Sequence, residues 1–257
     1  MPSKTSQDGY AAPAVIRAFE LMRLLTDTPR PLSLTELSKK LGCGKSSIHG
    51  LLKALIQVNA LNRVGKTYVM GPAMAELSLR GWNIFKLVEK AQPALTRLRN
   101  ATGETVFLGV TGTSKSTIIA TRDALKPLKI SAPPGTEIPL QAGAVGKAFL
   151  SAMSRDSVDH FIETHGLPQF TPNSITEIDA YHRELETVRT SGYAMDNEEY
   201  LTGVKAVAVS INNRRGLPLA VWIAGFASSM DTVLTPETLT LITTTASELR
   251  AIVDNHN

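Results

Sequence analysis

Apolar residues recur every three or four positions between residues 14 and 25, which predicts a first helix. One face of this helix carries Val15, Phe19, Met22 and Leu25. The next segment, TDTPRP, contains two prolines, and proline cannot continue a helix because its nitrogen carries no hydrogen and its ring clashes with the preceding turn. The chain is therefore expected to turn at this segment.

Two further helices are predicted on either side of a short turn that contains glycine. Ser33 precedes Glu36 by three residues at the start of SLTELSKKL, which is the spacing of a capping box. After Gly42 and Gly44, a new helical pattern runs from about residue 45 to residue 58. Two helices joined by such a turn are typical of a helix-turn-helix.

A small hairpin and a pair of helices complete the first part of the chain. The β-prone runs LNRV and TYVM, joined by GK, predict a wing. Helical patterns follow in GPAMAELSLRGW and from about residue 84 to residue 101, and we place the domain junction near residue 78. The sequence thus predicts a flexible tail, a winged helix-turn-helix, linker helices and a larger domain, at residues 1–12, 13–77, 78–102 and 103–257.

Strand-like runs mix with helical patterns in the larger domain. The runs predicted as strands are TVFLGV, STIIAT, PLKIS, GYAMD, GVKAVAVSI and PLAVWIAGF. The helical patterns lie at about residues 145–153, 155–165, 177–191 and 236–255. Hairpin-like connections such as NNRRG favour an α+β sheet domain over a doubly wound α/β domain.

Charge is distributed unevenly between the two parts. Residues 1–75 hold 10 Lys and Arg against 4 Asp and Glu, a net +6, whereas residues 76–257 hold 17 against 19, a net −2. A basic small domain beside a mildly acidic larger one indicates a polyanionic partner for the first alone. The alternative is a metabolite-handling enzyme domain whose N-terminal bundle serves only for oligomerisation, but such a bundle has no reason to carry this charge.

The helix expected at residues 45–58 has two faces, which suits DNA binding. Its apolar residues pack into a core, and its polar front can enter the major groove, where short and flexible donors meet base edges and phosphates. The wing can reach the flanking backbone. The predicted DNA contacts are Lys45, Ser46, Ser47, His49 and Lys53 on the helix, and Arg63 and Lys66 on the wing.

Other compartments and chemistries are not expected. A single cysteine, Cys43, allows no internal disulfide and no cysteine-based zinc site, and it fits the reducing cytoplasm. The N-terminus lacks the apolar core of a signal peptide, and no run reaches the roughly 18 apolar residues of a membrane span. GAVGKA has Ala148 where a phosphate-binding loop needs a hydroxyl. We therefore expect neither membrane association nor a cofactor.

Catalytic and metal-binding patterns are weak as well. The acidic run MDNEEY contains no histidine, and the chain has no GxSxG, so neither an enzyme nor a metal site is expected. The three histidines His160, His165 and His182 fall on predicted helices or at their ends, where exposure to solvent is the expectation.

Several long segments match a known family, in that family's order. The segments PAVIRAFELMRLLTD and PLSLTELSKKLGCGKSSIHGLLKAL resemble the opening helix and the helix-turn-helix of the IclR family of bacterial transcription regulators. The segments TGETVFLGV, LQAGAVGKAFL, LPQFTPNSIT and SGYAMDNEEYLTGVKAVAVSI resemble signatures of its effector domain. The resemblance implies a winged helix joined by a linker helix to a GAF-like ligand-binding domain. It also implies dimers or tetramers acting on partly palindromic DNA operators.

Two positions of the DNA-reading helix depart from that family. Its members often have Pro where Gly44 stands and Arg where Gly50 stands. Gly50 costs up to about 1 kcal/mol of helix propensity relative to Ala and removes a potential DNA contact. The operator sequences of relatives therefore do not transfer to this chain.

The resemblance also implies a ligand cup in the larger domain. Its polar groups would be the backbone N–H groups near Gly143 and Ala144 and the carboxylate of Asp196. The family typically adds a Cys after the acidic motif and a Ser-x-Ser-Gly on a neighbouring strand. At the corresponding positions this chain has Ala206, Trp222 and Ala224.

These replacements change the expected effector. A small oxo-acid would lose hydroxyl and thiol partners worth about 0.5–1.5 kcal/mol each, whereas an aromatic ligand could stack on Trp222. We therefore expect an effector with an aromatic or other apolar body and one carboxylate or hydroxyl group. The alternative is that Trp222 fills the cup and the domain has lost its effector.

Overall fold

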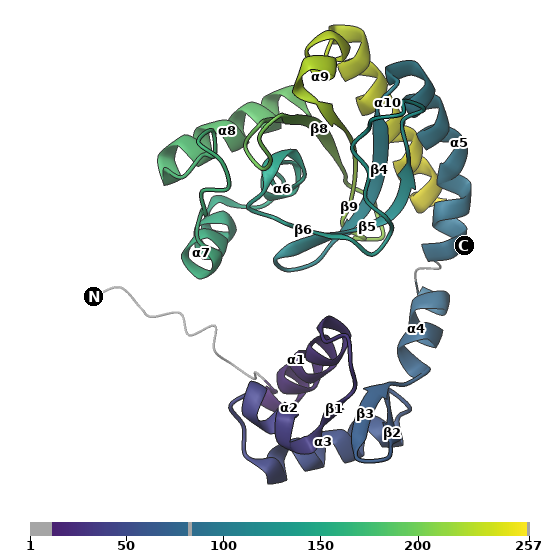
Figure 1. Cartoon of the computed structure of the whole chain (residues 1–257), viewed down its shortest axis with the longest axis vertical. Helices are drawn as coiled ribbons and strands as arrows, with labels where there is room; N and C mark the ends of the chain where they lie inside the picture. The colour runs from purple at the N-terminus through teal and green to yellow at the C-terminus, as the bar shows by residue number, and fades with distance from the viewer. Residues whose placement is uncertain (1–11, 82–83, 256–257) are drawn as a thin grey trace. The chain divides into compact units, whose positions relative to one another are not determined.

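Residues 12–81 and 84–255 are described in the computed structural model, and they fall into two units, residues 1–83 and 84–257 (Figure 1). Apart from Ala12, the predicted tail at residues 1–12 lies outside the described residues. Residue 78, where we placed the domain junction, lies inside helix α4. No described helix has both the length and the apolar character needed to cross a bilayer.

The smaller unit combines helices with a three-stranded antiparallel sheet. The sheet has the strand order β1-β3-β2, and the predicted hairpin β2–β3 is confirmed. Strand β1 was not predicted because it is only two residues long, too short for a periodic pattern. The elements are α1 (Pro13–Asp27), β1 (Leu32–Ser33), α2 (Leu34–Lys40), α3 (Lys45–Gln57), β2 (Leu61–Val64), β3 (Thr67–Met70) and α4 (Ala73–Gly81).

The predicted capping box begins α2. The Ser33 hydroxyl accepts a hydrogen bond from the backbone N–H of Glu36 at 3.4 Å, and the Glu36 carboxylate accepts one from the backbone N–H of Ser33 at 2.8 Å. A hydrogen bond from Arg30, first of all, and those from Ser33 lower the pKa of Glu36 to about 2. The start of the helix-turn-helix is therefore held by side chains of its own first turn.

Only the second half of the apolar face of α1 is covered. Met22 and Leu25 are buried against the core of the unit, together with Leu21. Val15 and Phe19, earlier on the same face, are 55% and 50% exposed. The start of α1 therefore presents an apolar surface that the described residues of its unit leave exposed.

The larger unit is built on a six-stranded antiparallel sheet with the strand order β6-β5-β4-β9-β8-β7. Helices α5 and α10 pack on one face of this sheet, and α6 packs on the other, with α8 beside it (Figure 1). The elements are α5 (Ile84–Thr102), β4 (Thr105–Thr111), β5 (Lys115–Arg122), β6 (Glu137–Pro139), α6 (Gly143–Leu150), α7 (Arg155–His165), α8 (Ile178–Ser191), β7 (Ala194–Asn197), β8 (Val204–Ile211), β9 (Leu219–Phe226), α9 (Ala227–Val233) and α10 (Pro236–Asp254).

One strand prediction is wrong. The run PLKIS, residues 127–131, forms a loop, because the free edge of β5 pairs with β6 instead. Ile118 donates from its backbone N–H to Thr136 and accepts from Gly135, so this edge is occupied by residues 135–139. The carbonyl of Ile130 accepts a hydrogen bond from the side-chain hydroxyl of Thr105 rather than from the backbone N–H of a neighbouring strand. Residues 127–131 therefore form no strand despite their β-prone composition, because the edge of β5 is already paired.

Candidate functional site

The front of α3 is exposed, and its rear is buried. Ile48, Leu52 and Leu55 lie in the core of the smaller unit. The predicted DNA contacts on this helix, Lys45, Ser46, Ser47, His49 and Lys53, are all exposed. Gly44 caps the helix with an extended backbone and no side chain, so the N–H groups of the first turn have no side-chain cap. Such a helix N-terminus is suited to a phosphate.

The wing adds two more exposed cationic side chains. Arg63 lies on β2, and Lys66 follows the Gly65 turn between β2 and β3. The Arg63 guanidinium is held over this turn, because its Nε donates to the carbonyl of Gly65 at 2.9 Å. The structure thus leaves all seven predicted contacts accessible on the helix-turn-helix and its wing.

Gly50 marks an open position on the same helix. It is exposed, and a Cβ added there would meet no atom within 4 Å. Packing within the chain therefore does not require glycine at this position.

The predicted cup residues come together on the α6 face of the larger sheet. Asp196 on β7 pairs with Ala206 on β8, which in turn pairs with Ala224 on β9. Gly143 begins α6 at a φ of 58°, and a Cβ on it would lie 2.2 Å from Oδ2 of Asp196. Only glycine fits there, because the carboxylate lies against the first turn of α6.

Trp222 packs into the buried cluster that the predicted cup residues form. Its side chain is 3% exposed and stacks on Phe107, with the ring centroids 5.4 Å apart and the planes at 19°. It also lies over Gly109, where a Cβ would come within 2.8 Å of two ring carbons. Ala144, Ala206 and Ala224 belong to the same buried cluster. This packing is the arrangement that the filled-cup alternative expects.

Burial dominates the electrostatics of Asp196. It raises the pKa of this carboxyl from 3.8 to about 6, and the neighbouring Glu199 carboxylate adds to the rise. Hydrogen bonds from the backbone N–H groups of Glu199, at 2.7 Å, and of Tyr200 oppose the rise, as does the charge of Lys147. Asp196 therefore changes its charge close to neutral pH.

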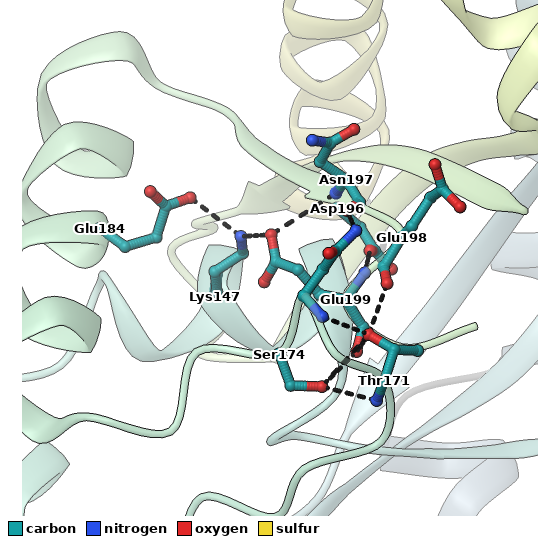
Figure 2. A network of polar contacts seen from close by, with 9 residues as sticks. Lys147, Thr171, Ser174, Glu184, Asp196, Asn197, Glu198 and Glu199 are labelled. Atoms are coloured by element: carbon teal, nitrogen blue, oxygen red, sulfur yellow. Dashed lines mark hydrogen bonds and ion pairs between the residues drawn. The ribbon is translucent and has the colours of Figure 1, made fainter. Parts of the chain in front are cut away.

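Lys147 is a buried cation that sequence reasoning missed. It lies on α6, its side chain is 1% exposed, and its Nζ is 2.9 Å from Oε1 of Glu184 and 2.7 Å from Oε1 of Glu199 (Figure 2). We considered it only as part of a defective phosphate-binding loop. The available signal was a lysine in the middle of the apolar helix GAVGKAFL, where an unpaired charge is not tolerated.

Two hydroxyl groups donate hydrogen bonds to the backbone of the loop that carries Glu198 and Glu199. Thr171 Oγ1 donates to the carbonyl of Glu198 at 2.7 Å, and Ser174 Oγ donates to the carbonyl of Glu199 at 2.7 Å (Figure 2). Glu198 adopts a φ of 61°, which non-glycine residues rarely do. The segments LPQFTPNSIT and MDNEEY are therefore held together around the end of β7.

The expectation for the three histidines was wrong in one case. His160 and His165 are exposed, but His182 is buried on α8, with Nε2 2.6 Å from Oδ1 of Asp159. The pairing across two helices makes burial possible, since the carboxylate satisfies the ring nitrogen. In the described part of the chain, no group of three or more His, Cys, Asp or Glu could hold a metal ion.

The raised pKa of Asp196 predicts a pH-dependent stability. Between pH 3.8 and about 6 the folded chain binds this proton more tightly than the unfolded chain, so the free energy of unfolding should fall as pH rises through that window. Asp196→Asn cannot ionise and should be more stable than the unmodified protein above pH 6, by at most about 3 kcal/mol. Urea unfolding at pH 4, 5, 6 and 7 measures this difference.

The exposed Asp179→Asn is the matched control. The difference in free energy of unfolding between this variant and the unmodified protein should not rise between pH 4 and pH 7. A stability difference between Asp196→Asn and the unmodified protein that stays constant from pH 4 to pH 7 would contradict the assignment.

Two family models, one for each part of the chain, match it. A family model described as "Bacterial transcriptional regulator IclR C-terminal" matches residues 82–251, and one described as "IclR helix-turn-helix domain" matches residues 14–65. The chain is 28% identical over 213 residues to the HTH-type transcriptional regulator BhcR of Paracoccus denitrificans, which covers 82% of this chain and 76% of that protein.

Solved structures agree over nearly the full length. An IclR transcriptional regulator from Alicyclobacillus acidocaldarius is 25% identical and superposes with a TM-score of 0.68, covering 95% of this chain and 98% of that one. An IclR homologue from Microbacterium hydrocarbonoxydans, crystallised with 4-hydroxybenzoate, is 17% identical with a TM-score of 0.67, covering 93% and 97%. The latter likeness concerns the fold alone.

Proposed function

The chain belongs to the IclR family of bacterial transcription regulators, and from this we propose how its residues read DNA and sense a ligand. It is a DNA-binding transcriptional regulator with an effector-binding domain, and it is not an enzyme. Family membership removes the alternative of an enzyme domain with an oligomerisation bundle. What remains is which residues make the contacts and what kind of effector is bound.

The operator contacts are assigned to the front of α3 and to the wing. The observation that carries this assignment is that all seven side chains are exposed, while Ile48, Leu52 and Leu55 of the same helix are buried. Ser47 and His49 lie near the N-terminal end of α3, where recognition helices meet base edges. We assign Lys66, on the wing, to a contact with a DNA phosphate.

Substitutions on α3 and on the wing should have different effects. Ser47→Ala or His49→Ala should relax sequence preference by about 1–3 kcal/mol, because each removes a base contact, and should leave binding to random DNA largely intact. Lys66→Ala should weaken binding to all sequences alike, because a phosphate contact carries no sequence information. Fluorescence anisotropy with an in-vitro selected operator and with a scrambled duplex measures both effects. Unchanged discrimination in the Ser47 and His49 variants would refute the assignment of the reading face.

Self-association into dimers or tetramers on partly palindromic operators is part of the same proposal. The uncovered apolar start of α1 supports it, since Val15, Ile16 and Phe19 are each at least half exposed. Contiguous apolar side chains of this size are typical of surfaces that associate with another chain.

For the effector, we propose a small molecule with an aromatic or other apolar body, bound at Gly143, Ala144, Asp196, Ala206, Trp222 and Ala224. The apolar side chains of this cluster support such a body. Entry requires that Trp222 turn away from Phe107. Because the Asp196 carboxylate already lies against Gly143, a ligand hydroxyl suits the first turn of α6 better than a ligand carboxylate does.

Thermal-shift measurements with ligands of both classes test this proposal. Phenol and 4-hydroxybenzoate, at about ten times their Kd, should raise the Tm of the unmodified protein by about 3 °C or more. Glyoxylate and pyruvate, at the same concentrations, should raise the Tm less. Trp222→Ser should lose the response to aromatic ligands, and the conservative Trp222→Phe should retain most of it. Glyoxylate or pyruvate stabilising the unmodified protein better than either aromatic compound would refute the apolar cup.

A further inference from the structure

A cleft of about 950 Å³ lies on the larger unit, beside α7 and the chain reversals at the ends of β4–β5 and β8–β9. Its volume is at the upper end of the range for small-molecule sites. The described residues that line it include none of the six residues assigned to the cup. The cleft is therefore a separate feature of the larger unit.

The walls of the cleft are largely apolar and carry little charge. Leu140, Phe149, Phe161 and Leu217 line it. The ring of Phe161 also stacks on His165, with centroids 4.6 Å apart. The titratable residues among its described lining are one aspartate and two histidines, all exposed, and no lysine or arginine is among them. The described lining offers an anionic ligand no lysine or arginine as a partner, and its largely apolar walls favour an uncharged molecule.

One wall holds a hydroxyl without a hydrogen-bond partner. Thr111 lines the cleft and is 9% exposed, and its Oγ1 has no partner among the described residues. Its backbone N–H is satisfied by the carbonyl of Pro218 at 2.8 Å. Ser116, directly opposite on β5, is buried with its Oγ also unpartnered among the described residues. Buried hydroxyls are normally hydrogen-bonded, so this pair needs an explanation.

We propose that this cleft is a second small-molecule site, which takes an uncharged ligand with an aromatic or aliphatic body and one hydroxyl group that hydrogen-bonds to Thr111. The Thr111 hydroxyl is covered in the structure. A rotation of about 120° about χ1 moves Oγ1 to the position that the methyl group or the β-hydrogen now holds, and in the liganded state one of these rotamers directs Oγ1 toward the ligand. The apolar walls hold the body of the ligand, and the hydroxyl selects it over the hydrocarbon of the same shape.

Benzyl alcohol and toluene test the site, because they differ by one hydroxyl group. Methyl NMR of the full-length protein labelled at methionine gives position-specific reporters. Met153 lines the cleft, whereas Met195 precedes Asp196 on β7 with its side chain on the exposed face of that strand, so it reports from outside both sites. Benzyl alcohol should shift the Met153 signal saturably, with little effect on Met195, and should bind about five to ten times more tightly than toluene.

Two variants distinguish the contribution of the Thr111 hydroxyl to ligand binding from that of the open volume of the cleft. Thr111→Val keeps the shape and should lower the affinity for benzyl alcohol about five- to tenfold, to that of toluene, while toluene binds as before. Ala152→Trp, at an exposed position lining the cleft, should abolish the Met153 response to both ligands. The exposed Thr240→Trp on α10 is the matched control and should bind both ligands as the unmodified protein does.

Trp222→Ser separates this site from the proposed cup. Its Met153 response should be unchanged even where the aromatic response of the cup is lost, so either proposal can fail without the other. Three results would overturn the second site: equal affinity for the two ligands, no saturable shift of Met153, or a response that Trp222→Ser abolishes. Dissociation of the oligomer by Ala152→Trp, together with no ligand response at Met153, would identify the cleft as an interface between copies instead.

Discussion

Operator affinity is expected to fall by about five to seven powers of ten for each tenfold increase in salt. Lys45 and Lys53 are exposed on α3, and Arg63 and Lys66 are exposed on the wing, and a dimer would present each of them twice. Eight neutralised phosphates at about −0.9 each give a limiting slope near −7 in a plot of log affinity against log salt. The release of condensed counterions drives this part of binding, so salt weakens it directly.

Anisotropy titrations from 50 to 500 mM KCl measure the slope. Lys53→Ala should make it shallower by about two in a dimer, because two phosphate contacts are lost. Lys90→Ala removes the same charge from an exposed position on α5, in the other unit, and should leave the slope unchanged. A slope shallower than about −2 would contradict the proposed docking, and a slope near half the predicted value would indicate that one protomer binds alone.

Lys147→Met is expected to destabilise the larger unit by about 3–5 kcal/mol. The side chain is 1% exposed, and those of its partners Glu184 and Glu199 are 29% and 15% exposed. Without the ammonium group, two carboxylates and the nearby Asp196 would face one another in a poorly hydrated space. The cost arises chiefly from the charges left unpaired.

Urea unfolding at pH 7 measures this loss. The double variant Lys147→Met/Glu199→Gln should regain a substantial part of it, because it also removes a stranded charge. Arg97→Met breaks the exposed pair with Glu248 and should leave the unfolding midpoint almost unchanged, since exposed ion pairs contribute little. If Lys147→Met matched this control, the buried network would have no structural role.

Elements with local signals were predicted most accurately. Helix α7 spans residues 155–165 as expected, because Ser154 caps its start and Gly166, at a φ of 72°, ends it. The wing strands also match, since a glycine turn joins two short β-prone runs. The loop at PLKIS was missed because pairing depends on which segment reaches the edge of β5, and no local pattern contains that information.

The sites divide in the same way. The front of α3 could be found from the sequence because one helix carries both the exposed donors and the buried leucines. The cup residues could be named from the sequence, but the packing of their side chains could not be predicted. The stacking of Trp222 on Phe107 and the placement of Asp196 against Gly143 each join residues from different elements. The role of Lys147 could not be predicted either, because its partners Glu184 and Glu199 lie 37 and 52 residues away in the sequence.

The open space at Gly50 has a consequence for how this regulator can change its targets. A Cβ at this exposed position meets no other atom within 4 Å, so a side chain other than proline can extend from it without disturbing the core. Replacing glycine would also remove its unfavourable effect on helix formation, up to about 1 kcal/mol relative to alanine. On the proposed docking of α3, a single codon change at this position would alter the DNA preference of a protein that folds as well as before. After gene duplication, this position would let two copies diverge in the promoters they serve while keeping the same sensor.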